Sequence, residues 1–97
     1  MSEFSIGTLL SIPCKVSEGP MLSEKVISCN IDTQPPIEIE GVVPSDLTKE
    51  QRVIAAVSGI NKNYVSLVFN GEMFRAKNPI KIPMYWITQN AEIVSNE

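Results

Sequence analysis

Apolar and polar residues alternate with a period of two in several separate segments of this chain, and this pattern constrains the fold more than any other feature. The clearest segments are residues 10–16, 26–31, 37–43 and 64–69. Successive side chains of a β-strand point to opposite faces of the sheet, so the alternation predicts strands with one buried and one solvated face. Prolines and turn-forming residues separate the segments. We therefore predict a mostly-β protein built from short antiparallel strands.

The length of 97 residues indicates one domain. About five to seven short strands joined by tight turns favour a small antiparallel barrel, because closure removes exposed sheet edges. We assign residues 1–87 to this barrel and residues 88–97 to a polar C-terminal tail. Asn70-Gly71 is the preferred dipeptide of a two-residue hairpin turn, so we expect it to join strand 64–69 to a strand at 72–76.

Residues 47–60 allow two interpretations. Val53 to Val57 form a compact apolar block of strand length, which favours a strand over 52–58 preceded by a short helical turn near 44–50. The alternative is an α+β fold with one helix over 48–58, because Thr48 and Gln51 have the spacing of a capping box and Gly59 stands where a helix would end.

Residues 37–69 resemble part of an OB-fold RNA-binding domain. The resemblance is carried by residues 40–47, by Val53, Ala55 and Val57, and by residues 65–67. An SH3-like barrel would show the same pattern. The resemblance implies a small barrel with a helical turn between two strands, and an RNA-binding function. The strands expected before it lack the aromatic residues that such domains stack on bases.

Missing residue types narrow the chemistry. The chain has no histidine, the usual general base near neutral pH, and only two cysteines, too few for a four-thiolate zinc site. It has no glycine-rich phosphate loop. We therefore expect a protein that is not an enzyme, with no catalytic residue, cofactor or metal. No apolar run is long enough to cross a membrane, and an acid near the N-terminus is unlike a signal peptide, so we expect a cytoplasmic protein.

Two pairs of residues have functional and structural interpretations. If the chain turns between Met21 and Leu22, Cys14 lies opposite Cys29 on the apolar side of a hairpin. We interpret the pair as two buried thiols, with a redox-sensitive pair or a disulfide as the alternative. Glu38 and Glu40 share one strand face, which we interpret as a solvated surface rather than a catalytic carboxylate pair.

Charge is distributed unevenly along the chain. Residues 1–50 contain three lysines and eight acids, a net charge of −5, whereas residues 51–82 contain five cations and one acid, a net charge of +4. These charges either form a basic surface for an acidic partner or face each other across the folded protein.

The expected partner surface combines the basic segment with the aromatic residues that follow it. Its members are Lys62, Arg75, Lys77, Lys81, Tyr85 and Trp86. Tyr and Trp are common anchors of protein interfaces. We predict a non-catalytic interaction module or accessory subunit that binds a protein partner or a second copy of itself. The alternative is an OB-type protein that binds RNA or single-stranded DNA.

Overall fold

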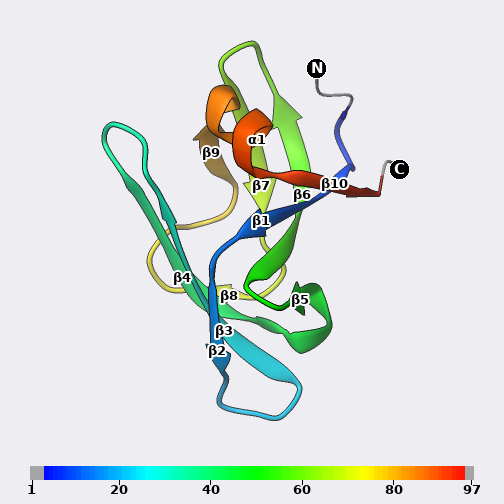
Figure 1. The fold of residues 1–97 in the computed structure, drawn as a ribbon, viewed down its shortest axis with the longest axis vertical. Coiled ribbons are helices and arrows are strands. Elements are labelled where there is room, and N and C mark those ends of the chain that lie inside the picture. The colour runs from blue at the N-terminus through cyan, green and yellow to red at the C-terminus, as the bar shows by residue number, and fades with distance from the viewer. Residues whose placement is uncertain (1–3, 96–97) are drawn as a thin grey trace.

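The computed structural model describes residues 4–95 (Figure 1). Strands account for most of its regular structure. They are β1 (Leu9–Pro13), β2 (Lys15–Glu18), β3 (Glu24–Ile31), β4 (Ile37–Pro44), β5 (Thr48–Lys49), β6 (Arg52–Ile60), β7 (Tyr64–Val68), β8 (Glu72–Met73), β9 (Ile80–Pro83) and β10 (Glu92–Ser95). A 3-10 turn spans Ser45–Leu47, and the helix α1 spans Met84–Asn90.

The strands form two antiparallel sheets. The first has the order β10-β1-β6-β7-β9, with β5 paired to β6, and the second has the order β2-β3-β4-β8. β1 and β2 follow one path that bends at Cys14, so a single stretch of chain serves both sheets (Figure 1). The prediction of a mostly-β protein is confirmed. Neither sheet closes on itself through the strand pairs of residues 4–95, so the structure does not show the expected closed barrel.

The core lies between the inner faces of the two sheets, as the alternation predicts. In β3, Ile27, Cys29 and Ile31 are buried, whereas the residues between them are more exposed. β1 and β6 follow the same rule. The core residues exposed by 2% or less are Leu10, Ile12, Ile27, Cys29, Ile31, Ile39, Val43, Val53, Ala55, Val57, Val65, Leu67, Phe69, Ile82 and Ile87.

The segment with two interpretations is a strand. β6 covers Arg52–Ile60 and pairs with β1 on one side and β7 on the other. The alternative helix over 48–58 is therefore wrong. Alternate residues of a strand point to the same face, and in this segment one face packs against the core. The short helical turn expected near 44–50 is the 3-10 turn at Ser45–Leu47.

The hairpin predicted at Asn70-Gly71 is wrong. β7 pairs with β9, and β8 pairs with β4 in the other sheet, so the chain crosses between sheets at this dipeptide. Glycine is needed here for space, because a Cβ atom on Gly71 would overlap the carbonyl oxygen of Val42. The strand expected over 72–76 stops at Met73, and residues 74–79 form a loop.

A side chain occupies the place where a hairpin partner of β7 was expected. The amide of Asn78 accepts a hydrogen bond from Phe69 N–H at 2.9 Å and donates one to Phe69 C=O at 2.8 Å. One carboxamide thus satisfies both backbone groups of Phe69, as a neighbouring strand would.

The C-terminal segment packs on the domain as helix and strand. α1 continues to Asn90, and β10 pairs with the outer edge of β1, with Leu10 opposite Ile93. The last two residues of the expected tail lie outside the described residues. No helix in the described part of the chain has the length and apolar character that a membrane crossing requires.

Candidate functional site

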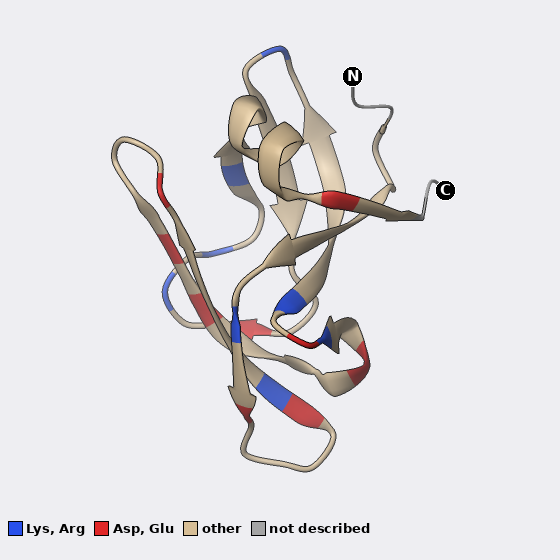
Figure 2. Ribbon diagram, in the orientation of Figure 1, with Lys and Arg blue, Asp and Glu red and all other residues tan. Residues whose placement is uncertain are grey.

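Two of the predicted surface residues meet in one cleft of about 420 Å³. Lys81 comes from β9 and Tyr85 from α1, and the tip of the β3–β4 hairpin forms the opposite wall. The full lining is Thr33, Gln34, Pro35, Ile37, Asn63, Tyr64, Lys81, Pro83 and Tyr85. Figure 2 shows a cation on β9 and another at the β6–β7 turn, and only Lys81 carries charge within the lining itself.

The aromatic walls of the cleft follow from strand and helix geometry. Val65 is buried, so its neighbour Tyr64 points outward from β7 and is 44% exposed. Tyr85 precedes Trp86 in α1 and is 56% exposed, whereas Trp86 is 5% exposed. Two half-exposed tyrosine rings therefore line the same hollow as Lys81.

Hydrogen bonds fix the wall that carries the tyrosines. The side-chain oxygen of Asn61 accepts hydrogen bonds from the N–H groups of Asn63 and Tyr64, both at 2.8 Å. The carbonyl of Asn63 accepts a hydrogen bond from Met84 N–H at 2.8 Å. The β6–β7 turn is thereby attached to the start of α1.

The opposite wall is fixed from beneath. Trp86 donates a hydrogen bond from Nε1 to the Asp32 carboxylate at 3.0 Å, which connects α1 to the hairpin tip. Thr33 is 5% exposed, and its hydroxyl donates to the carbonyl of Pro35 at 2.9 Å. Both walls are therefore held in place before any ligand arrives.

The structure separates the six predicted surface residues. Lys81 and Tyr85 line the cleft, and Lys62 lies in the turn beside it, next to Asn63. Trp86 is 5% exposed and does not line this cleft, and its indole N–H positions the hairpin tip. Lys77 lies in the loop over 74–79.

Arg75 is engaged within the molecule. Its guanidinium lies 3.2 Å from the carboxylate of Glu38 and 3.6 Å from that of Glu40. Its backbone N–H also donates to the carbonyl of Glu40 at 3.3 Å. This contact joins the basic loop to the acidic face of β4, so the charge of Arg75 is balanced internally.

Tyr64 lines the cleft with an aromatic ring but is not among the six surface residues predicted from the sequence. The signal was present, because alternation places Tyr64 on the solvated face once Val65 and Leu67 are assigned to the core. The pairing of β7 with β9 then brings Tyr64 opposite Pro83, directly before α1. Sequence alone does not give that pairing.

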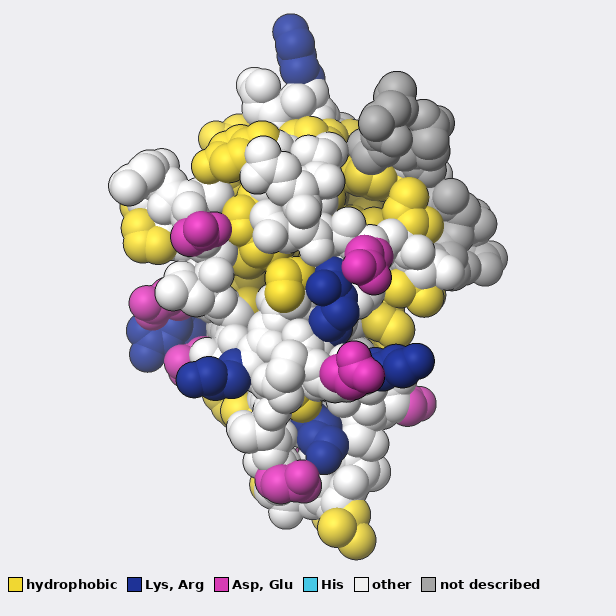
Figure 3. Space-filling model, in the orientation of Figure 1, with side chains coloured by type: hydrophobic (Ala, Val, Ile, Leu, Met, Phe, Trp, Pro, Cys, Tyr) yellow, Lys and Arg dark blue, Asp and Glu magenta, His cyan; other side chains and the backbone are white. Residues whose placement is uncertain are grey.

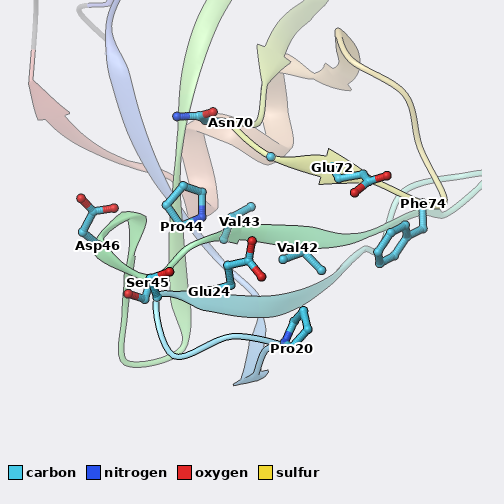
Figure 4. A pocket seen from close by; sticks show the side chains of 12 residues that line it. Pro20, Glu24, Val42, Val43, Pro44, Ser45, Asp46, Asn70, Glu72 and Phe74 are labelled. Atoms are coloured by element: carbon cyan, nitrogen blue, oxygen red, sulfur yellow. The ribbon is translucent and has the colours of Figure 1, made fainter.

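A second hollow, of about 650 Å³, lies beside β8 (Figure 4). Glu24 and Glu72 line it, with Asp46 and Phe74 at opposite ends of the view. Among the described residues, no group of three or more His, Cys, Asp or Glu side chains is placed to hold a metal ion. The hollow also contains none of the six predicted surface residues.

Comparison with known proteins adds no relative. No family model matches the chain, and the searches of curated proteins and of solved structures find no significant match.

Proposed function

We propose that this protein is a non-catalytic interaction module of the cytoplasm, whose cleft between Tyr64 and Tyr85 binds an extended, proline-containing segment of a partner protein. The observation that carries this proposal is the meeting of two half-exposed tyrosines and Lys81 in one preformed cleft. The bend of β1–β2 between two sheets supports a further proposal that the fold is an open variant of an OB-like or SH3-like barrel.

The chemistry of the cleft matches a polyproline II segment. Such segments dock in grooves lined by aromatic side chains, and they lose little conformational entropy because they are already extended. Tyr64 and Tyr85 supply aromatic faces, and Pro35 and Pro83 add apolar surface. Lys81 provides one cation at the edge, which favours an acidic residue beside the partner's prolines.

The charge distribution favours a peptide over a nucleic acid. A groove that follows a phosphate backbone needs several available cations. Here Arg75 is engaged by two glutamates, and the lining of the cleft offers only Lys81. On the face shown in Figure 3, cationic and acidic side chains are intermixed. The net charge of −3 also favours a peptide over a negatively charged nucleic acid.

A titration monitored by NMR tests the proposal. The probe is a synthetic hexaproline peptide with a glutamate at each end. Saturable shifts of amide signals around the cleft are expected, and Tyr85→Ala should weaken binding about tenfold, or ~1.4 kcal/mol. Lys81→Glu should weaken it about fivefold, with a smaller effect at high salt.

Two matched variants control for general surface effects. Phe74→Ala removes an aromatic ring that is 60% exposed and lies outside the cleft, and Lys77→Glu reverses a cation of the 74–79 loop. Both should bind the peptide as the unaltered protein does. Equal losses in the control and cleft variants would refute the assignment of the site. Failure of the peptide to bind, together with salt-sensitive binding of single-stranded DNA, would replace the proposal with the nucleic-acid alternative.

A further inference from the structure

Cys14 and Cys29 face each other at the bend that joins the two sheets. Lys15 of β2 pairs with Ser28 of β3, so the next position of this antiparallel ladder places Cys14 opposite Cys29. A hydrogen bond from the Cys29 thiol favours the thiolate form of Cys14 and lowers the pKa of that thiol. The pair therefore lies where one strand leaves the first sheet and enters the second.

The backbone at this position suits a covalent link between the strands. Both backbone groups of Val16 point away from β3, because they bond the side-chain amide of Gln51 at 2.9 and 3.3 Å. The N–H of Cys14 also points away, toward the carbonyl of Gln51 at 3.1 Å. Cys14 and Cys29 are thus a pair without mutual backbone hydrogen bonds. In such pairs the Cα atoms approach to about 4.5 Å, within the range that a disulfide spans.

The two thiols differ in access. Cys29 is 1% exposed in the core, whereas Cys14 is half-buried and lines an open cleft of about 640 Å³. Lys15, Asp32 and Trp86 line the same cleft. A small oxidant in solvent can therefore reach Cys14, whereas Cys29 offers almost no exposed surface.

The two thiols also differ in their electrostatic environment. The hydrogen bond from Cys29 lowers the pKa of the Cys14 thiol below its ordinary value of 9.0, burial opposes this, and the positive charge of Arg52 adds to it. The pKa of Cys29 is raised, first by the same hydrogen bond and then by burial. Of the other charges at the cleft, Lys15 also favours a thiolate, and Asp32 opposes it while bonded to Trp86. Since the thiolate is the nucleophile, Cys14 is the attacking residue and Cys29 the resolving one.

We propose that Cys14 and Cys29 form a peroxide-sensitive dithiol, in which Cys14 is oxidised first and Cys29 then closes a disulfide across the bend. In the first step the Cys14 thiolate attacks one oxygen of hydrogen peroxide. The O–O bond breaks, a sulfenic acid forms on Cys14, and the departing hydroxide takes a proton and leaves as water.

The second step consumes the resolving thiol. The sulfur of Cys29 attacks the sulfur of Cys14, the S–O bond breaks, and the hydroxide leaves with the proton of Cys29 as a second water. Overall, two thiols lose two electrons and two protons, and one peroxide is reduced to two waters. In a reducing cytoplasm such a disulfide is transient, which is typical of redox-sensing pairs.

Mass spectrometry of the whole protein after mild peroxide treatment tests the proposal. The unaltered chain should lose the mass of two hydrogen atoms and all reactivity toward a thiol reagent, and reduction should restore both. Its melting temperature should rise by roughly 10 °C, because the link restricts the unfolded chain.

Single variants test the order of the two steps. Cys29→Ser should stop at a sulfenic acid on Cys14, seen as the added mass of one oxygen and trapped by dimedone. Cys14→Ser should react at least ~10-fold more slowly. Since Cys29 is buried, Cys29→Ala serves as a second variant in case serine disturbs folding, which circular dichroism monitors. Equal oxidation rates of the two single variants, or oxidation of the unaltered chain beyond sulfenic acid without a disulfide, would overturn the proposal.

Discussion

Replacing Gly71 with alanine tests the point at which the chain crosses from one sheet to the other. An added Cβ would overlap the carbonyl oxygen of Val42, and the next atoms, Val42 C and Val43 Cα, would lie at 3.0 Å. All three are backbone atoms of β4, so no flexible side chain can move aside. To accept alanine, the crossing has to move away from β4 and strain the adjacent pairing of β8 with β4.

The expected loss combines two effects. Overpacking against a rigid neighbour costs about 1–3 kcal/mol. Strain on the short β4–β8 ladder, where Gly41 pairs with Met73, removes the equivalent of one hydrogen bond, about 1 kcal/mol. We therefore expect Gly71→Ala to lower the free energy of unfolding by about 2–4 kcal/mol. That is a large part of the ~5–15 kcal/mol that stabilises a typical domain.

Urea denaturation followed by tryptophan fluorescence measures this loss. With an m-value of about 1.5 kcal/mol per molar urea, the midpoint should fall by roughly 2 M. Gly59→Ala is the matched control, because a Cβ there would meet the side chain of Ser66 at an ordinary 3.5 Å. The control should leave stability unchanged or raise it by up to about 1 kcal/mol.

Gly71→Asn distinguishes the crossing from a hairpin turn. Asparagine is tolerated at positive φ in tight hairpin turns, so it would cost little if Asn70-Gly71 formed one. At the crossing any Cβ overlaps the Val42 carbonyl, so asparagine should cost as much as alanine. Near-native stability of Gly71→Asn would refute the reasoning.

Three further changes probe other parts of the structure. Asp32→Ala should lower the free energy of unfolding by about 1–3 kcal/mol, because it removes the hydrogen-bond acceptor of buried Trp86; a double-mutant cycle with Trp86→Phe measures the coupling, and zero coupling would contradict the bond. Arg75→Ala should lower the free energy of unfolding by less than about 1 kcal/mol, because the arginine and its two glutamate partners are exposed to solvent. Urea titrations at low and high salt should show that this decrease becomes smaller as the salt concentration rises. Alkylation of Cys14 by iodoacetamide should reach half of its maximal rate below pH 9.0. The hydrogen bond from Cys29 lowers the pKa of the Cys14 thiol, so the reactive thiolate is populated at lower pH. A midpoint at or above pH 9.0 would be inconsistent with this.

Local patterns predicted the strands well but not their partners. Apolar and polar residues alternate in 26–31 and 37–43 because one face of each strand is buried. This pattern is the same whichever strand lies beside it. The position of Cys14 opposite Cys29 was also predictable, because residues at equal distances from the turn of a hairpin lie opposite each other. The partner of β7 was not, since the turn preference of Asn70-Gly71 is a local property and the crossing depends on a distant carbonyl of β4.

The candidate site illustrates the same limit. Lys81 and Tyr85 were identified because their residue types and outward positions are local properties. Tyr64 was missed because the pairing of β7 with β9 brings it to the cleft. The sequence predicts Trp86 at the partner surface, but the ring is nearly buried and its indole N–H bonds to Asp32, on a hairpin more than fifty residues earlier in the chain. Arg75 is part of the predicted partner surface, and the structure pairs it with two glutamates of β4, which matches the alternative that charges face each other within the fold.

The pairing of β10 with β1 affects the order in which the protein can be completed during synthesis. Leu10 and Ile93 lie opposite each other, so one edge of β1 stays uncovered until β10 has left the ribosome. The hairpin of β3 and β4 involves near neighbours and can form early, whereas the six-stranded sheet can be finished only when its final strand arrives. A nascent chain stalled before β10 would therefore expose an unpaired edge of β1, where another unfinished copy could add a strand.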